Sequence, residues 1–421
     1  MVTIKTITAM EILDSRGNPT VETTLTLSDG NAVVASVPSG ASVGKYEAVE
    51  LRDGDLGHYN GLGVLKAVAN VNEIIGPKLI GLDPVKQGKI DETMLLLDDT
   101  PNKSTLGANA ILSVSLAVCK AAATAVQLPL YQYISELLGS KLPKTIDKMP
   151  TPTFNIINGG KHGAGNLDFQ EFHIIPASIK SYHDSLQIGE DIYQKLKLVL
   201  IARNAIHSVG DEGGYAPNLY TNIDALEAVM EAIQTTKFKF GFDVFLGLDI
   251  AASNIKKEES YYIKDRPTAL TTADFITYLI DLHHEYRLLM LEDPLAEDDW
   301  KGWQILTEKI GREVLIVGDD LLVTNPQRLK KAIADKACSA ILVKPNQIGT
   351  MSETLQVIQI AKANDVKTVV SHRSGETNDT FIADLAVGVT ADYVKFGAPA
   401  RGERVAKYNR LLYIEKELKL Y

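Results

Sequence analysis

In the last two-thirds of the chain, short apolar runs recur at intervals, and each one ends on a charged or polar residue. These end residues are spaced 43, 27, 25, 28 and 23 residues apart and are Asp249, Glu292, Asp319, Lys344, His372 and Lys395. A (β/α)₈ barrel uses roughly 31 residues for each strand and its return helix. Continuous apolar runs are typical of parallel strands that are buried on both faces. The pattern therefore predicts an α/β fold built on a TIM-type barrel. Its six end residues meet at the mouth where barrel active sites lie.

The start of the barrel is expected to be irregular. Two strand candidates, residues 154–158 and 169–175, have only a Gly-rich loop between them. No return helix fits into that loop, so the two strands should form a hairpin that makes the second barrel strand antiparallel. Helical patterns follow around residues 181–204 and 222–235.

Residues 1–135 show a different pattern and are predicted to form a smaller α+β domain. Alternation over residues 21–27, a Ser-Asp-Gly-Asn turn and an apolar run over 32–37 predict an antiparallel hairpin. Helical stretches are expected near residues 63–71 and 107–126. The prediction therefore places the small domain at 1–135, a proline-containing linker at 136–152 and the barrel at 153–421.

Composition limits the possible partners. The formal net charge is −10, with no basic stripe, which argues against a nucleic-acid or anionic-membrane partner. No apolar run is expected to reach the roughly 18 residues of a membrane span. Both cysteines, Cys119 and Cys338, lie in apolar stretches. We expect them to be buried, reduced thiols and not part of a disulfide or a zinc site. Reduced thiols fit a cytoplasmic protein.

Three of the strand-end residues are carboxylates: Asp249, Glu292 and Asp319. Hard cations such as Mg²⁺ take oxygen ligands, typically a few carboxylates completed by water and substrate. Like charges that meet at one mouth without compensation would repel, so these carboxylates predict a metal site. Lys344, on the next strand, has two open interpretations. It either neutralises the carboxylates or acts as a general base whose pKa a neighbouring cation lowers.

Cationic and hydroxyl donors follow at the last two strands. Arg373, Ser374 and Lys395 suit a phosphate or carboxylate ligand. Glu212 lies in the Gly-flanked loop 210–214, which either reaches into the site or is a simple turn. His162 lies in another Gly-rich loop, where a lone histidine is most often solvated. Residues 38–44 form a small-residue loop, a connector that could also serve as a lid.

Several ordered motifs, which span nearly the whole chain, resemble those of the enolase family. The matching stretches are residues 13–22, 38–42, 106–112, 158–162, 210–214, 291–300, 346–350 and 371–377. The resemblance implies a lid domain followed by a modified barrel with an antiparallel second strand. It also implies a glycolytic and gluconeogenic lyase that reversibly dehydrates 2-phospho-D-glycerate to phosphoenolpyruvate, and a homo-oligomer, either a dimer or an octamer.

The resemblance also implies the roles of individual residues. Asp249, Glu292 and Asp319 would bind a first Mg²⁺, and Ser42 a second Mg²⁺ that arrives with the substrate. Lys344 would be the base at C2, and Glu212 the acid that protonates the departing C3 hydroxyl. The substrate contacts would be Gln170, Arg373, Ser374 and Lys395, with His162, Glu171 and His372 lining the site.

Three positions depart from the family's usual sequence. Val43 replaces a threonine in the lid, Ser113 replaces a glycine, and Tyr413 replaces an arginine that reaches a glutamate of the partner subunit. Two alternative functions are weighed against the lyase. One is another α-proton-abstracting barrel enzyme, such as a racemase, although such enzymes need no phosphate anchor like Arg373. The other is a secondary plasminogen-binding role, whose usual C-terminal lysine is absent, because the chain ends at Tyr421.

Overall fold

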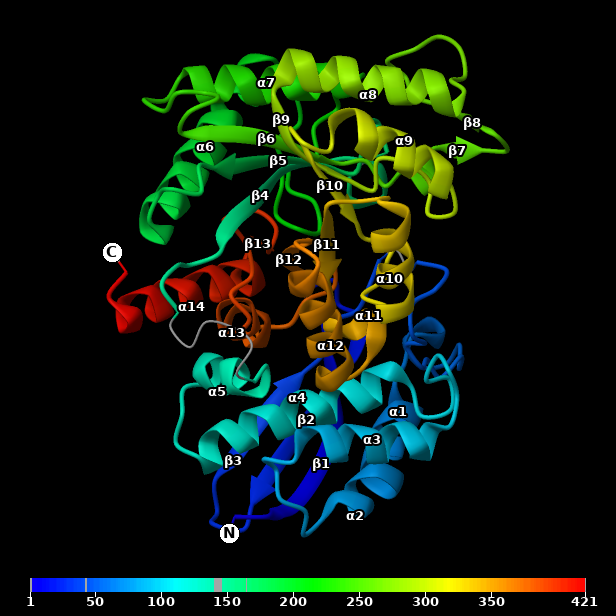
Figure 1. Ribbon diagram of the computed structural model, residues 1–421, viewed down its shortest axis with the longest axis vertical. Helices are drawn as coiled ribbons and strands as arrows, with labels where there is room; N and C mark the ends of the chain where they lie inside the picture. The colour runs from blue at the N-terminus through cyan, green and yellow to red at the C-terminus, as the bar shows by residue number, and fades with distance from the viewer. Residues whose placement is uncertain (1, 42–43, 140–145, 164, 421) are drawn as a thin grey trace.

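The computed structural model describes residues 2–41, 44–139, 146–163 and 165–420. The chain begins with an antiparallel sheet at one end of the molecule (Figure 1). Its strands are β1 (Ile4–Leu13), β2 (Pro19–Leu27) and β3 (Ala32–Ser36). Residues 19–27 and 32–36 confirm the predicted hairpin, while β1 adds an edge strand that the sequence pattern did not predict.

Helices cover one face of this sheet. They are α1 (Leu65–Ala69), a π-helical segment (Asn70–Ile75), α2 (Gly76–Leu79), α3 (Gln87–Asp98), α4 (Ala108–Ala125) and α5 (Leu130–Leu137). Helix α4 lies across β2 and β3, where Ser113 Oγ is 2.7 Å from Thr23 Oγ1. The hydroxyl of Ser113, which stands where the family usually has glycine, is therefore hydrogen-bonded in the core.

Helix α4 corrects one expectation. It has 18 residues and is long and apolar enough to cross a membrane by length and composition, although no such segment was expected. In the fold, 83% of that window is buried. It is therefore the central helix of the small domain, and its apolar character serves packing.

The second unit is a closed barrel in the order β4-β5-β6-β9-β10-β11-β12-β13. Its strands are β4 (Thr151–Asn158), β5 (Glu171–Pro176), β6 (Val244–Asp249), β9 (Leu288–Glu292), β10 (Leu315–Gly318), β11 (Ala340–Val343), β12 (Lys367–Ser371) and β13 (Tyr393–Lys395). β5 runs antiparallel to both β4 and β6, and the other barrel pairs are parallel. The predicted barrel with an antiparallel second strand is confirmed.

Return helices surround the barrel. They are α6 (Tyr182–Ala202), α7 (Asn222–Gln234), α8 (Thr272–Tyr286), α9 (Trp300–Ile310), α10 (Pro326–Asp335), α11 (Pro345–Ile348), α12 (Met351–Ala363), α13 (Phe381–Gly388) and α14 (Gly402–Leu418). Ser181 and Thr221 cap α6 and α7 by accepting the N–H of the third residue of each helix, which satisfies an otherwise unpaired donor. Both predicted helices are confirmed. A short hairpin, β7 (Lys256–Lys257) and β8 (Ser260–Tyr261), lies outside the barrel.

Close packing holds α6 against β4. A Cβ added at Gly189 in α6 would lie 2.4 Å from the ring of Phe154, which is fully buried. Only glycine therefore permits this approach of helix and strand. Inside the barrel, a separate apolar layer fills the space below the mouth with Ile175, Met290, Val317, Ala340, Leu342 and Val369.

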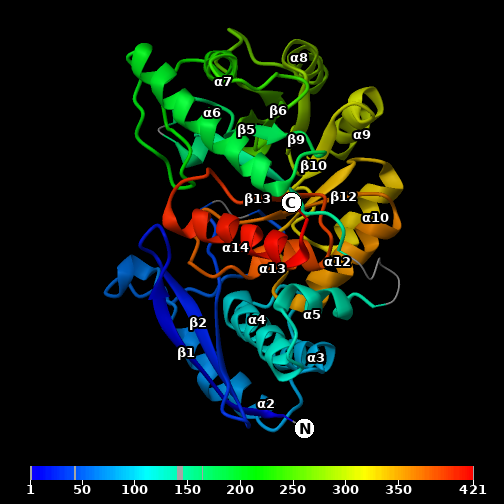
Figure 2. The same ribbon diagram turned by 90° about the vertical axis from the view of Figure 1, so that its left-hand side faces the viewer.

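The two units pack closely together, and Figure 2 shows α5 of the small domain beside α13 of the barrel. Helix α5 extends to Leu137 and β4 begins at Thr151, so regular structure reaches two residues into each end of the predicted linker 136–152. The small domain also contacts the barrel mouth through Ser39, Glu47 and Ala48. Ser39 N donates to Gly375 O at 2.7 Å, and Gly375 N donates to Ser39 O at 2.9 Å.

Tyr413 is exposed on α14, with 65% of its surface accessible. Its neighbour Arg410 forms a two-pronged ion pair with Asp384 of the same chain, at 2.7 and 2.8 Å. The expected oligomer, dimer or octamer, stays a prediction.

Candidate active site

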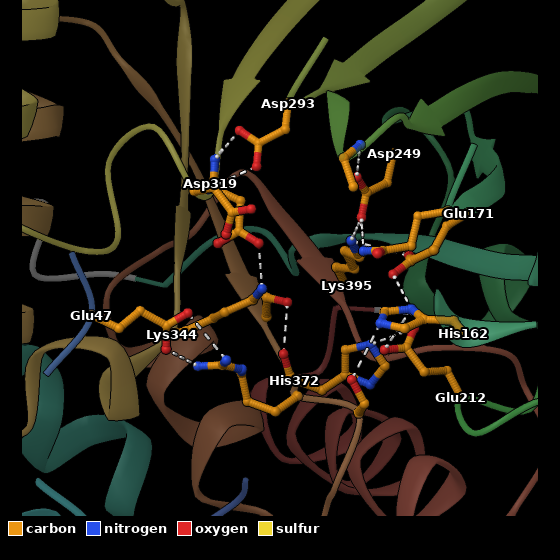
Figure 3. Close-up of a pocket in the computed structure, with 16 residues that line it drawn as sticks. Glu47, His162, Glu171, Glu212, Asp249, Asp293, Asp319, Lys344, His372 and Lys395 are labelled. Carbon is orange, nitrogen blue, oxygen red and sulfur yellow. Dashed lines mark hydrogen bonds and ion pairs between the residues drawn. The ribbon is translucent and has the colours of Figure 1, made fainter. Parts of the chain in front are cut away.

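A pocket lies at the barrel mouth and collects most of the predicted site residues (Figure 3). Its walls include His162, Gln170, Glu171, Glu212, Asp249, Asp319, Lys344, His372, Arg373, Ser374 and Lys395. Glu292 lies directly beside Lys395. Ser42 and Val43 lie outside the described residues, so the predicted second metal ligand stays a prediction. The site thus combines the ends of six strands (β6 and β9–β13), two Gly-rich loops and the antiparallel β5.

Lys395 lies at the centre of the acidic half of the pocket. Its Nζ is 2.8 Å from both oxygens of Glu292, 3.1 Å from Asp249 Oδ2 and 3.0 Å from Glu171 Oε2. Burial acts to lower the pKa of Lys395, but the surrounding carboxylates, Asp249 foremost, hold that pKa well above its usual value. The ammonium is therefore a fixed positive charge between three strands.

Lys344 occupies the other side of the same mouth. Its Nζ lies 2.5 Å from Asp319 Oδ2, while Gln347 Nε2 donates to Asp319 Oδ1 at 2.8 Å. Thr324 Oγ1 in turn donates to Gln347 Oε1 at 2.8 Å, which fixes the amide. Burial acts to lower the pKa of Lys344, but the charge of Asp319 outweighs burial and raises it. The ion pair with Asp319 agrees with the interpretation that Lys344 neutralises the carboxylates. The same position at the mouth also suits a general base, so both interpretations stay open.

Glu212 lies between two histidines at the opposite wall. Its Oε1 is 3.4 Å from His162 Nδ1, its Oε2 is 3.3 Å from His372 Nε2, and Asn155 Nδ2 donates to Oε2 at 3.0 Å. Burial lowers the pKa of His372 to about 4, with Arg404 adding to the effect. Both side chains are buried in the pocket. The interpretations of Glu212 as part of a simple turn and of His162 as a solvated side chain are therefore wrong.

His162 is the charged partner of this carboxylate. Although burial opposes it, Glu212 and Glu171 raise the pKa of His162. Burial and the nearby Glu171 act to raise the pKa of Glu212, but the two histidines, His162 foremost, outweigh them and the pKa is lowered. The imidazole of His162 thus lies within reach of Glu212 and favours the charged form of that carboxylate.

Arg373 connects the pocket to the small domain. Its guanidinium contacts Glu47 at 2.8 and 3.2 Å, and both side chains are 4% exposed. Arg404 supports the loop from behind by donating to the carbonyls of Arg373, at 2.6 Å, and Ser374, at 2.5 Å. The hydroxyl of Ser374 lies 3.3 Å from His162 Nε2. The loop after β12 therefore presents a fixed guanidinium and a hydroxyl to the pocket.

Two acidic residues next to predicted ligands also belong to the site. Asp293 accepts the backbone N–H of Asp319 at 3.0 Å and of Asp320 at 2.7 Å. Burial, strengthened by Asp320, raises the pKa of Asp293 well above its usual value, and burial together with Asp319 raises that of Asp320 to about 7. With Asp319 they form a compact acidic cluster whose oxygens lie within 4.8 Å of one another.

The donor chemistry of the mouth fits a divalent cation. Eight carboxylates gather there against the cations Lys344, Arg373 and Lys395; they are Glu47, Glu171, Glu212, Asp249, Glu292, Asp293, Asp319 and Asp320. Burial and the neighbouring Asp249 raise the pKa of Glu292 well above its usual value, the mark of carboxylates crowded beyond their counter-charges. The buried Gln170 Oε1 adds an acceptor without a hydrogen-bond partner in the described chain. Hard oxygen donors in excess suit Mg²⁺.

The structure divides the predicted ligands between the two lysines. Asp249 and Glu292 turn to Lys395, and Asp319 turns to Lys344. Their assignment to one first cation stays a prediction. It requires that these contacts give way when the ion binds.

Fold and site together define a two-domain barrel enzyme with an acidic metal site and a cationic anion site at one mouth. The sequence model of the enolase C-terminal TIM barrel domain matches residues 146–420, and that of the enolase N-terminal domain matches residues 4–134. The chain belongs to the enolase family. The family consists of Mg²⁺-dependent lyases that act on small phosphorylated substrates.

Three pocket residues were missed from the sequence: Glu47, Asp293 and Asp320. The two aspartates directly follow predicted ligands, so the doubled acids Glu292-Asp293 and Asp319-Asp320 were the available signal. Glu47 carried none, because its contact with Arg373 spans 326 positions in the chain.

Proposed function

We propose that the chain catalyses the reversible dehydration of 2-phospho-D-glycerate to phosphoenolpyruvate and water, as a cytoplasmic glycolytic enzyme. One observation supports this reaction above all. Lys344 and Glu212 line the same pocket from opposite sides (Figure 3). An elimination that removes a proton from one carbon and hydroxide from the next needs a base and an acid so arranged.

Lys344 takes the proton from C2. Its Nζ lies 2.5 Å from Asp319 Oδ2, and the charge of this carboxylate raises the pKa of the lysine. Asp249, Glu292 and Asp319 would hold Mg²⁺, which neutralises charge that develops on the substrate carboxylate. A cation held by Asp319 would take this partner from the lysine and so favour the neutral form that a general base needs.

Glu212 gives a proton to the departing hydroxyl at C3. The imidazole of the neighbouring His162 lies 3.4 Å away. An anionic substrate beside Glu212 favours the neutral carboxyl, so substrate binding and proton uptake support each other. Asn155 and His372 keep the carboxyl aimed into the pocket.

The substrate's phosphate would bind the guanidinium of Arg373 and the hydroxyl of Ser374. A planar guanidinium binds phosphate through paired hydrogen bonds. Lys395, Gln170 and the imidazoles of His162 and His372 complete the walls. Glu171, paired with Lys395 at 3.0 Å, positions that lysine.

Turnover of 2-phosphoglycerate by the purified chain tests the proposal. With Mg²⁺ present, we expect the ultraviolet absorbance of the enol phosphate product to appear, and chelation of the metal to stop it. Unphosphorylated 2-hydroxy acids serve as matched substrates that lack the phosphate. If these are turned over or epimerised while 2-phosphoglycerate is not, the chain is another α-proton-abstracting enzyme and the proposal is wrong.

A further inference from the structure

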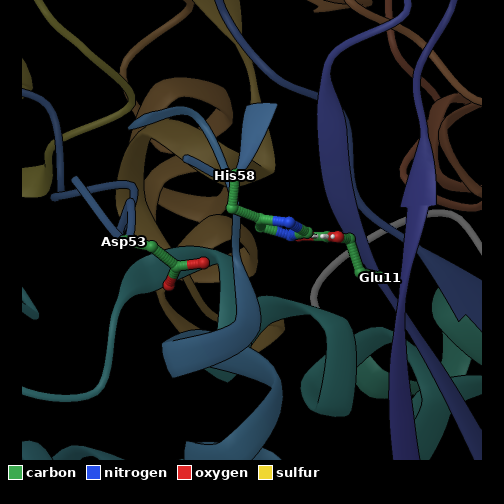
Figure 4. A group of neighbouring side chains, drawn as sticks. All are labelled: Glu11, Asp53 and His58. Atoms are coloured by element: carbon green, nitrogen blue, oxygen red, sulfur yellow. Dashed lines mark hydrogen bonds and ion pairs between the residues drawn. The ribbon is translucent and has the colours of Figure 1, made fainter. Parts of the chain in front are cut away.

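A second group of metal-type ligands lies in the small domain, away from the barrel mouth (Figure 4). Glu11 comes from β1, whereas Asp53 and His58 come from the loop before α1. Their ligand atoms all lie within 4.8 Å of one another, and His58 Nε2 is 2.8 Å from Glu11 Oε1. We infer that Glu11, Asp53 and His58 bind a first-row divalent transition-metal ion, for which Zn²⁺ is the natural probe.

Backbone donors already orient both carboxylates. Val64 N donates to Glu11 Oε2 at 2.7 Å, while the N–H groups of Leu65 and Lys66 each donate to Asp53 at 2.8 Å. A carboxylate oxygen that accepts one N–H keeps a second lone pair. Hydrogen bonds of this kind commonly fix carboxylates that ligate metals. The two carboxylates are therefore held in place and still have lone pairs available for a metal ion.

Gly63 packs tightly against two of the ligands. A Cβ added at Gly63 would lie 2.6 Å from Asp53 Oδ2 and 2.4 Å from Cδ2 of His58. The backbone φ of Gly63 is not in the left-handed region, so no turn requirement explains a glycine there. A side chain at this position would push Asp53 and His58 out of their present arrangement.

The charge balance of the cluster favours a cation. Across the residues that the structure describes, neither Glu11 nor Asp53 forms an ion pair with a lysine or an arginine. The Lys66 ammonium nearby donates instead to the backbone carbonyl of Asp53. Two carboxylates thus face one imidazole. The His58 side chain is 34% exposed and that of Glu11 12%, so an ion and its water ligands have access.

The donor set selects the class of metal. One imidazole nitrogen with two carboxylate oxygens suits Zn²⁺, and an imidazole ligand favours first-row transition metals over Mg²⁺. Three protein ligands leave a position for water. A bound ion would fasten the loop 53–63 to β1 and so add to the hydrogen bond between His58 and Glu11.

A comparison of Zn²⁺ binding by the wild type and by single variants tests the inference. The whole chain, stripped of metal and then saturated with Mg²⁺ at the barrel mouth, is dialysed against Zn²⁺, and bound zinc is measured per chain. His58→Gln keeps an amide that can donate to Glu11 but removes the imidazole. The matched control is His207→Gln, which removes an exposed histidine outside the cluster.

We expect wild type and His207→Gln to bind one more Zn²⁺ than His58→Gln, or to bind it about 10–100-fold more tightly. Zn²⁺ should also raise the melting temperature of wild type more than that of His58→Gln. Equal stoichiometry and affinity in all three proteins would show that His58 is only a hydrogen-bond partner of Glu11.

Gly63→Ala gives an independent arm, because it removes no ligand. Its methyl group would push Asp53 and His58 out of their present arrangement, so Zn²⁺ affinity should fall while the fold without zinc, followed by circular dichroism, persists. Undiminished zinc binding in a folded Gly63→Ala protein would overturn the proposed position of the ion.

Discussion

Lys344 and Glu212 allow proton removal and hydroxide loss to be measured apart. Lys344→Ala deletes the ammonium that lies 2.5 Å from Asp319 Oδ2. Glu212→Gln keeps the size of the side chain and an oxygen that can accept from Asn155, but it cannot deliver a proton. If the two residues serve different steps, the variants should fail at different steps.

The magnitudes follow from the contacts. A positioned acid or base typically contributes about 10²–10⁴-fold, or about 3–5 kcal/mol of barrier. Lys344→Ala also removes the ion-pair partner of Asp319, but Gln347 still holds the other oxygen at 2.8 Å, so the metal ligand stays oriented. We expect Lys344→Ala to lose about 10³–10⁴-fold in both C2 proton exchange and dehydration. Glu212→Gln should lose about 10²–10⁴-fold in dehydration and less than about tenfold in exchange.

The assay follows exchange of the C2 proton of 2-phosphoglycerate in deuterated water by NMR, beside steady-state dehydration. Glu227→Gln, an exposed glutamate on α7, is the matched control and should change neither rate. Exchange that survives in Lys344→Ala and vanishes in Glu212→Gln would reverse the assigned roles. Equal loss of both rates in both variants would refute separate steps.

Three further outcomes are expected. Asp319→Ala should abolish Mg²⁺-dependent turnover because a carboxylate ligand is lost; full activity at millimolar Mg²⁺ would contradict the metal assignment. Gly189→Ala should lower the free energy of unfolding by about 1–2 kcal/mol in urea titrations. The methyl overlaps the Phe154 ring, at a cost of about 1–3 kcal/mol that a helix-propensity gain of up to about 1 kcal/mol offsets in part. Burial raises the thiol pKa of Cys119, and that of Cys338 to about 12. Ellman's reagent should therefore label neither thiol in the native protein at pH 8 and both after denaturation.

Much of the barrel could be predicted because its strands are buried on both faces. Their continuous apolar runs stand out, and the side chain that ends each run lies at the mouth by topology. Strand β1 escaped prediction for the opposite reason. It is an edge strand on which Met10 and Leu13 are 57% and 54% exposed, so its hydrophobic pattern does not report a buried face.

Sequence patterns could predict only those site residues that directly end a buried strand. Gln170 and Glu171 lie at the beginning of β5, and they reach the mouth because that strand runs backwards. The predicted hairpin held this signal, although the residues themselves came from family resemblance. Asp293 has a left-handed backbone, with φ of 39°. That conformation aims its carboxylate at the N–H groups of Asp319 and Asp320, and no sequence pattern shows it.

The Arg373–Glu47 ion pair gives the resting pocket a built-in competitor. A substrate anion that seeks this guanidinium must exchange with a carboxylate already held there at 2.8 Å. A free inorganic anion gains only that exchange, whereas a molecule with a second acidic group gains another cation contact deeper in the mouth. On the proposed function, the pair therefore acts against any anion that gains nothing beyond this exchange. Because Glu47 belongs to the small domain, binding of the substrate phosphate at Arg373 would also release a contact between the two domains.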